Sequence, residues 1–326
     1  MFMKKLNSNK KAKPQKSIFI AALVAIALAG CNKDEKTDRD AARMQQFVIQ
    51  ISDYARGVKP GFIVIPQNGP ELAFNATEPN DGTMSSYISA IDGIGIEELF
   101  YDGKLAVDNE RLSMLRTLKS SSKIMVSDYL SNNANIADAK QRNRNEGFIA
   151  FPRSAENYHY GLIPTDITDE NADDILTLAD AKNYLYLIST DNYATKQAMI
   201  QAIAATNYDM VLIDLFFEEV ALSNSEINSL KTKANGAKRL AIAYISIGSA
   251  ENWRYYWKSG WKRGNPSWLK KKYDGYSDEI WVEFWNEEWQ HIIFGNNDSY
   301  IKKIIDAGFD GAYLDNVEAY YFLHNK

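Results

Sequence analysis

Eight short apolar segments, most of them separated by helical periodicity, constrain the fold of this chain most strongly. They cover residues 62–66, 91–97, 123–127, 147–151, 184–188, 210–214, 240–247 and 311–315. Apolar residues recur at helical spacing at 41–56, 109–118, 136–145, 169–179, 195–205, 223–235 and 289–307, the last interrupted near Gly295. Strands that alternate with helices form parallel sheets, and eight repeats predict an α/β fold, a (β/α)8 TIM barrel. An open doubly wound sheet is the alternative, but no glycine-rich phosphate loop follows any segment.

The N-terminus resembles a targeting signal. Six lysines lie between residues 4 and 16, and an apolar run at 17–27 follows, too short to remain as a membrane span. The run ends in Leu28-Ala29-Gly30-Cys31, which resembles a bacterial lipobox, and Cys31 is the only cysteine of the chain. We therefore expect a leader at 1–31, a lipid on Cys31, a charged tether at 32–40 and one barrel domain at 41–326.

These signals predict a lipid-anchored protein of the bacterial cell envelope, in the outer membrane or facing the periplasm, that contacts the membrane through its N-terminal lipid. The net charge of -5 argues against a nucleic-acid partner, because binding phosphates requires a basic face. The 7 Trp, 19 Tyr and 14 Phe suit stacking on sugar rings or, equally, a large aromatic core. We expect a monomer.

Polar residues follow many of the predicted strands at their C-terminal ends. They are Gln67, Glu97, Asp128, Asp214, Glu251 and Asp315. A single carboxylate in this place can simply cap the next helix. Because the βα loops at this edge of a barrel build the active site, six such residues together favour a functional site there.

Four segments together resemble motifs of one enzyme family. They are YISIGSAENWR at 244–254, FDGAYLDNVEAY at 309–320, IPQNG at 65–69 and IDGIGIEELFY at 91–101. This set is similar to the glycoside hydrolase family of endo-α-1,4-polygalactosaminidases and their uncharacterised barrel relatives, over residues 41–326. The family order runs from the strand at 184–188 through Asp315 to IPQNG, so the resemblance implies a circularly permuted barrel here. Glu283-Phe-Trp-Asn286 departs from the Arg and Asp usual in relatives, which leaves the substrate preference open.

The resemblance implies that Asp315 is the nucleophile or base and that Glu97 is the acid/base of a two-carboxylate mechanism. Neighbours on a strand point to opposite sides, so Glu98 is the alternative to Glu97. We expect the Asp315 and Glu97 carboxyl groups within about 10 Å of each other. Residues expected to contact substrate hydroxyls are Gln67, Asn68, Asp128, Asp214, Tyr244, Glu251 and Trp285; for Asp128 and Asp214, a loop cap is equally compatible with the sequence.

Other chemistries fit the sequence less well. His159, His291 and His324 are scattered without metal-ligand spacing, and Ser246 does not lie in a Gly-x-Ser-x-Gly frame. We therefore expect neither a metal nor another cofactor. The expected partner is a polysaccharide. The resemblance implies an endo-acting glycosidase on an α-linked polymer, with an amino-sugar polymer as one option. A non-catalytic surface glycan-binding barrel is the alternative. The helix at 41–56 is expected to begin at the Asp315 end of the barrel.

Overall fold

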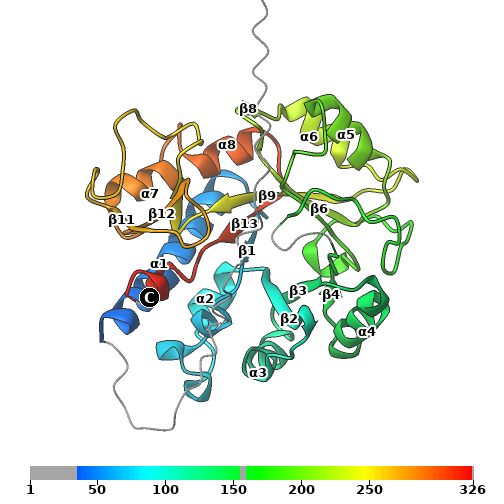
Figure 1. The fold of residues 1–326 in the computed structure, drawn as a ribbon, viewed down its shortest axis with the longest axis horizontal. Helices are drawn as coiled ribbons and strands as arrows, with labels where there is room; N and C mark the ends of the chain where they lie inside the picture. The colour runs from blue at the N-terminus through cyan, green and yellow to red at the C-terminus, as the bar shows by residue number, and fades with distance from the viewer. Residues whose placement is uncertain (1–34, 155–158, 325–326) are drawn as a thin grey trace, which may run out of the picture. The chain divides into compact units, whose positions relative to one another are not determined.

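The computed structural model describes residues 35–154 and 159–324 (Figure 1). Cys31 and the predicted leader lie outside the described residues. Within the described part of the chain, no helix is both long enough and apolar enough to cross a membrane.

Eight parallel strands coincide with the eight predicted segments. They are β1 (Ile63–Pro66), β2 (Gly93–Leu105), β3 (Lys123–Leu130), β4 (Ile149–Ala150), β5 (Leu185–Leu187), β6 (Met210–Asp214), β9 (Leu240–Ser246) and β13 (Gly311–Asp315). They form a five-stranded sheet in the order β1-β13-β9-β6-β5 and a three-stranded sheet in the order β2-β3-β4. The two sheets meet where Gln67 bridges Gly95 in parallel, and the last strand, β13, lies beside the first, β1.

The predicted α/β architecture with parallel strands is confirmed, whereas a closed ring of strand pairs is not found. Between β4 and β5 no strand pairing links the described residues. Side chains fill this junction instead: the rings of Phe151 and Tyr184 lie 5.6 Å apart. The carbonyl oxygen of Tyr160 also accepts hydrogen bonds from the backbone N–H groups of Ile188 and Ser189 at 3.0 Å.

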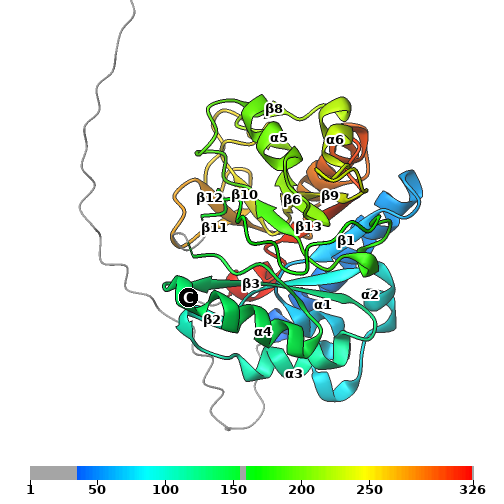
Figure 2. The same cartoon turned by 90° about the vertical axis from the view of Figure 1, so that its right-hand side faces the viewer.

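Helices lie outside the strands (Figures 1 and 2). They are α1 (Glu35–Val58), α2 (Ser85–Ala90), α3 (Asn109–Leu118), α4 (Ile136–Glu146), α5 (Lys196–Ala204), α6 (Asn224–Leu230), α7 (Glu287–Ile293), α8 (Tyr300–Asp306) and α9 (Ala319–Phe322). Short 3-10 turns are η1 (Pro70–Ala73), η2 (Asn75–Thr77), η3 (Pro79–Asp81), η4 (Asn133–Asn135) and η5 (Leu178–Asp180). As the sequence predicts, the helical region 289–307 is divided near Gly295, into α7 and α8.

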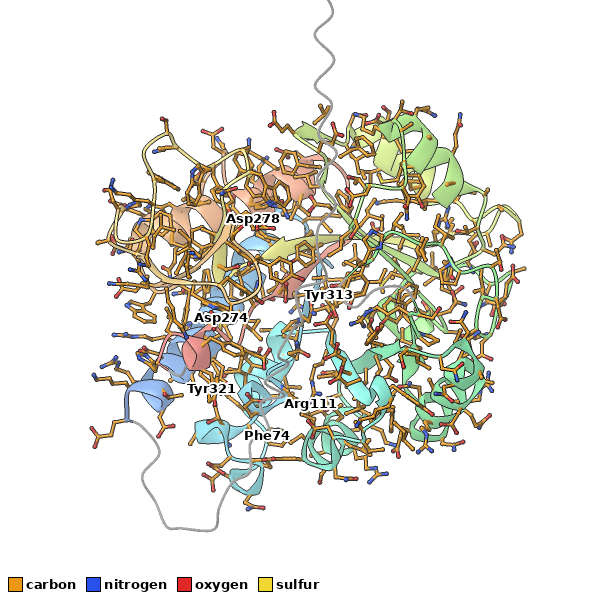
Figure 3. The ribbon with its side chains drawn as sticks, viewed as in Figure 1. Phe74, Arg111, Asp274, Asp278, Tyr313 and Tyr321 are labelled. Carbon is orange, nitrogen blue, oxygen red and sulfur yellow. The ribbon has the colours of Figure 1, made fainter. Side chains whose placement is uncertain are left out.

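The interior of the strand assembly is aromatic, and one glycine makes room for it. Tyr313 of β13 is fully buried and lies near the middle of the ring of strands (Figure 3). A Cβ at Gly95 would lie 1.8 Å from the Tyr313 hydroxyl, so only glycine fits there. The Tyr313 side chain thus approaches the backbone closely at this glycine.

Helix α1 begins at Glu35, six residues earlier than predicted, so residues 35–40 of the predicted tether are helical. Asp40 is fully buried and accepts hydrogen bonds from Arg43 at 2.8 Å and from His324, beyond α9, at 2.7 Å. At the other end, Arg56 contacts Asp92, just before β2. Helix α1 therefore begins near the C-terminal ends of the strands and ends near their starts, as predicted.

The aromatic region 253–276 contributes to a small antiparallel sheet. Its order is β10 (Ser249–Glu251), β12 (Glu279–Val282) and β11 (Leu269–Lys272), and a separate hairpin joins β7 (Phe216–Phe217) to β8 (Val220–Ala221). Trp268, Trp281 and Trp289 are buried in and beside the small sheet. Much of the aromatic content is therefore core, since these rings exclude water from an added layer.

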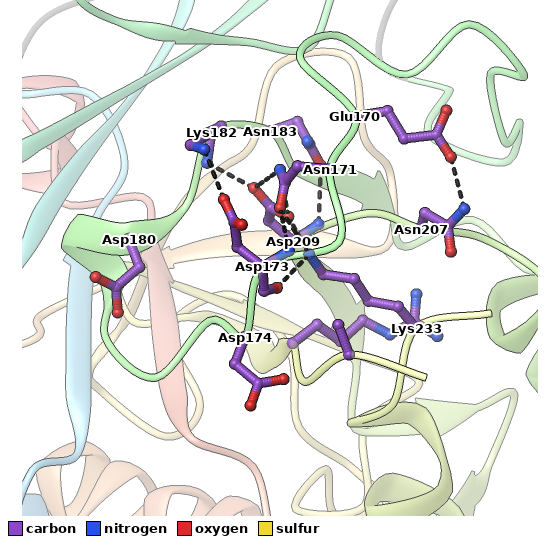
Figure 4. Close-up of polar contacts among 12 residues, drawn as sticks. Glu170, Asn171, Asp173, Asp174, Asp180, Lys182, Asn183, Asn207, Asp209 and Lys233 are labelled. Atoms are coloured by element: carbon purple, nitrogen blue, oxygen red, sulfur yellow. Dashed lines mark hydrogen bonds and ion pairs between the residues drawn. The ribbon is translucent and has the colours of Figure 1, made fainter. Parts of the chain in front are cut away.

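The helix predicted at 169–179 is wrong: up to the 3-10 turn η5 this stretch is irregular, because tertiary partners hold it. Asp209, which precedes β6, accepts hydrogen bonds from Asn171 at 3.1 Å and from Lys233 at 2.6 Å. The backbone N–H of Lys182 donates to the same carboxylate at 2.8 Å (Figure 4). Asn and Asp side chains that find such partners compete with helix formation.

Candidate active site

Asp315 ends β13, between β1 and β9, and its carboxylate is held from two sides. The hydroxyl of Tyr244 donates to Oδ2 at 2.5 Å, and the backbone N–H of Asn316 donates to Oδ1 at 2.7 Å. Burial, and then the charge of Glu97, raise the pKa of Asp315 to about 7, although both hydrogen bonds oppose this change. The group can therefore exchange a proton near neutral pH.

Glu97 lies on β2, separated from β13 by β1 alone. Neighbouring strands are about 4.8 Å apart, so the two backbones lie roughly 10 Å apart and their side chains share the C-terminal edge. The backbone N–H of Glu97 donates to Asn68 Oδ1 at 3.1 Å, and the hydroxyl of Tyr160 donates to its carboxylate. The structure thus brings the two predicted catalytic carboxylates to one edge.

Glu98 is held differently from its neighbour. Strand β2 is irregular after Glu97, and Glu98 has a φ of 56°, in the left-handed region. Its carboxylate accepts a hydrogen bond from Arg153 at 3.1 Å. Glu97 is the first of the charges that raise the pKa of Asp315. This geometry favours Glu97 over Glu98 as the partner of Asp315.

Three of the residues expected to contact substrate are close to these carboxylates or to the interior beside them. Tyr244 bonds Asp315, and Asn68 bonds Glu97, as described above. Gln67 is 3 % exposed, and its side-chain oxygen accepts a hydrogen bond from Tyr186 at 3.2 Å. Gln67 therefore belongs to the interior layer beneath the site rather than to its surface.

Asp128 is not available to a substrate. It is 1 % exposed, and its Oδ1 accepts hydrogen bonds from the backbone N–H groups of Phe100 and Tyr101 at 2.9 and 3.1 Å. Its Oδ2 accepts from Asn143 at 3.2 Å. The predicted contact with sugar hydroxyls is wrong, because Asp128 supports the irregular part of β2 from beneath.

Asp214 and Glu251 are both paired with one buried arginine. Arg254 lies 2.8 Å from Asp214 and 2.6 Å from Glu251. A buried charge needs such partners, so these carboxylates stabilise the loop after β10 rather than reach out to a ligand. Trp285 is also displaced from the site: it packs beneath the guanidinium of Arg43 on α1, at 4.6 Å.

Sequence reasoning missed a hydrogen-bond network around Asn316. The Asn316 amide donates to Ser249 at 3.1 Å and to Glu279 at 3.3 Å, and its oxygen accepts from Tyr273 at 3.1 Å. Burial raises the pKa of Glu279 to about 8. The position of Asn316 directly after Asp315 was the available signal; nothing in the sequence marks Glu279, which β12 brings in from a distant segment.

A cavity of about 380 Å³ lies beside β4 and β5, and its lining includes Phe151, Arg153, Tyr160 and Tyr184. It adjoins the site through Arg153 and Tyr160, the two side chains that bind Glu98 and Glu97. Among the described residues, no group of three or more His, Cys, Asp or Glu side chains could hold a metal ion. The chemistry that the site offers is that of paired carboxyl groups, one with a strongly raised pKa.

Comparison with known proteins gives a partial match. Residues 171–326 match the glycoside-hydrolase family GH114. An uncharacterized protein of Methanocaldococcus jannaschii is 35% identical over 153 residues, which are 46% of this chain and 41% of that protein. Uncharacterized proteins of Thermotoga maritima and Deinococcus radiodurans are 29% and 32% identical over 128 and 124 residues, covering 39% and 38% of this chain. The chain spans about two fifths of the length of these relatives (41%, 38% and 38%).

Proposed function

We propose, from the match of residues 171–326 to the glycoside-hydrolase family GH114, that the protein hydrolyses glycosidic bonds with Asp315 and Glu97 as its two carboxyl groups. The observation that carries the proposal is the placement of both carboxylates at one edge of the strands. After burial, the charge of Glu97 is the largest cause of the raised pKa of Asp315. Asp315 lies inside the matched region and Glu97 outside it. The role of Glu97 therefore rests on geometry and on the motif at 91–101.

Asp315 acts as the nucleophile or base in this mechanism, and Glu97 donates a proton to the leaving oxygen. The hydrogen bonds from Tyr244 and from the Asn316 N–H stabilise the ionised form of Asp315. In this mechanism Glu97 must hold a proton while Asp315 is ionised, so the active pair carries one proton. Because the pair loses this proton near the pKa of Asp315, about 7, kcat/KM should fall as the pH rises above that value.

The proposed substrate is an α-linked amino-sugar polysaccharide cut within the chain, as the motif resemblance implies. The protein's net charge of -5 supports a cationic polymer, because opposite charge favours its approach. We further propose that a lipid on Cys31 holds the enzyme at the bacterial cell envelope, and that the enzyme is a monomer. The pairing of β13 with β1 supports a permuted barrel, because a chain whose first and last strands pair can be opened elsewhere.

The test is release of reducing ends from a panel of α-linked galactosamine and glucosamine polymers, each in free-amine and N-acetylated form. We expect hydrolysis by the wild type and losses of about 10²–10⁴-fold in kcat for Asp315→Asn and Glu97→Gln. Glu98→Gln is the matched control and should keep most of the activity. Wild-type activity in Asp315→Asn would contradict the mechanism. Binding of a polymer without cleavage by the wild type would favour the glycan-binding alternative.

A further inference from the structure

Tyr276 is a large aromatic residue exposed beside the candidate site. It lies in the turn between β11 and β12, and it is 42% exposed. Trp268 and Trp281, on either side of it in the sequence, are buried. A single exposed ring is common at protein surfaces, so its position relative to the site decides whether it can contact a ligand.

A chain of contacts links Tyr276 to Asp315. Its ring lies 5.6 Å from the ring of Tyr273, in an edge arrangement. The Tyr273 hydroxyl donates to Asn316 at 3.1 Å, and Asn316 directly follows Asp315. In agreement, burial and then the charges of Glu97, Glu279 and Asp315 raise the pKa of Tyr276 to about 12.

The ring on which Tyr276 rests is held by a stack of aromatic side chains. Tyr273 stacks on Trp281 with ring centroids 4.3 Å apart and planes 15° apart. Trp281 in turn stacks on Phe322 of α9 at 5.0 Å. Because the rings beneath it are packed between β12 and α9, Tyr276 is presented from a rigid base, which lowers the entropic cost of using it to bind.

We propose that Tyr276 is a platform on which one pyranose ring of the substrate stacks, in a subsite beside Asp315 and Glu97. The inference rests on the proposed glycoside hydrolase function and adds a binding residue to it. An aromatic face offers a large apolar surface to the C–H face of a sugar, while neighbouring polar groups bind its hydroxyls. Tyr276 contributes binding energy and takes no part in the chemical step.

The first arm of the test is steady-state kinetics on the best polymer of the panel. Tyr276→Ala should raise KM about tenfold, equivalent to about 1.4 kcal/mol, with kcat changed less than about twofold, because stacking stabilises ground and transition states alike. Tyr276→Phe keeps the ring and should retain the wild-type KM. Tyr321→Ala, at a tyrosine on α9 that is 37% exposed, is the matched control and should change neither constant.

The second arm measures oligosaccharide binding to the inactive Asp315→Asn protein by calorimetry. Adding Tyr276→Ala should weaken binding about tenfold, as in the kinetic arm. If the wild type is active but Tyr276→Ala changes neither KM nor Kd, the proposed role of Tyr276 is wrong and the proposed function stands. The same conclusion follows if Tyr276→Ala lowers kcat and leaves KM unchanged. If the wild type cleaves nothing and Asp315→Asn binds nothing, the proposed function is wrong, and the platform falls with it.

Discussion

At the scale of single residues, the site concentrates carboxyl groups that hold protons near neutral pH. Burial is the main cause, and it raises the pKa of Asp315 to about 7 and that of Glu279 to about 8. Each ionisation of such a group in the folded protein is costly, because the charged form has lost solvent. Sites that tune acids and bases in this way give up stability for reactivity.

Asp315 should lower the stability of the protein at neutral pH. Its folded pKa of about 7 exceeds its unfolded value of 3.8, so the stability linked to its proton is fully present below 3.8 and is lost as the pH rises to about 7. Asp315→Asn removes this dependence. The free energy of unfolding, measured in urea from pH 5 to 8, should therefore be higher for the variant than for the wild type, and this difference should grow up to about pH 7.

The exposed Asp274→Asn serves as the control for this experiment, because Asp274 lies at the surface of the β11–β12 turn. Its stability difference from the wild type should stay constant across the same pH range. If Asp315→Asn also shows a constant difference, Asp315 does not carry the raised pKa on which the proposed acid–base chemistry depends.

At the scale of elements, the segment that precedes β5 is shaped by a buried ion pair rather than by its own periodicity. Lys233, just after α6, and Asp209, just before β6, are both fully buried and lie 2.6 Å apart. Lys233 also donates to the carbonyl oxygen of Asp173 at 2.9 Å, which ties the segment to the strand assembly (Figure 4). Removal of one member would leave the other charge buried without its partner.

Lys233→Ala should therefore lower the free energy of unfolding by about 3–5 kcal/mol. Lys302→Ala is the matched control, because Lys302 pairs with Asp306 at the surface of α8, and such exposed i,i+4 pairs contribute only about 0.3–0.5 kcal/mol. Chemical denaturation of both variants gives the comparison. Equal losses in the two variants would show that the buried pair has no special role in holding residues 171–183.

At the scale of the whole described unit, the last elements of the chain contact the first ones. Strand β13 pairs with β1, and His324 lies 2.7 Å from Asp40 of α1. Between β4 and β5, in contrast, no strand pairing is present in the described part of the chain. Cutting the chain between β4 and β5 would therefore separate no pair of hydrogen-bonded strands.

A permutant opened between residues 154 and 159 should fold. A flexible linker of about six residues, reaching roughly 14 Å by random-coil statistics, would join residue 324 to the start of α1. We expect cooperative unfolding and the wild-type activity on the same polymer. The control is a permutant opened inside β9, between Ile242 and Ala243, which breaks a strand paired on both edges and should not fold. Failure of the first permutant would argue against a permuted barrel.

The eight strands and their alternation with helices could be predicted from the sequence, because a strand buried on both faces is a local apolar run that needs no knowledge of its partners. The motif around Asp315 could likewise be recognised in one short segment. The sequence did not reveal which of the other polar residues at strand ends are buried and paired. Asp128 and Asp214 look like Asp315 in the sequence, but only the folded chain supplies Asn143 to the first and Arg254 to the second.

The same limit explains Glu279 and the segment 169–179. Glu279 reaches Asn316 because the small sheet of β10, β11 and β12 folds back towards β13. Lys233 binds Asp173, 60 residues away in the sequence, and this contact helps to hold a segment with helical periodicity in a non-helical conformation. Local periodicity determined which segments are strands and where a carboxylate ends them. Which of those carboxylates remains open to a substrate was decided by tertiary structure, because burial and the choice of hydrogen-bond partner depend on residues far apart in the chain.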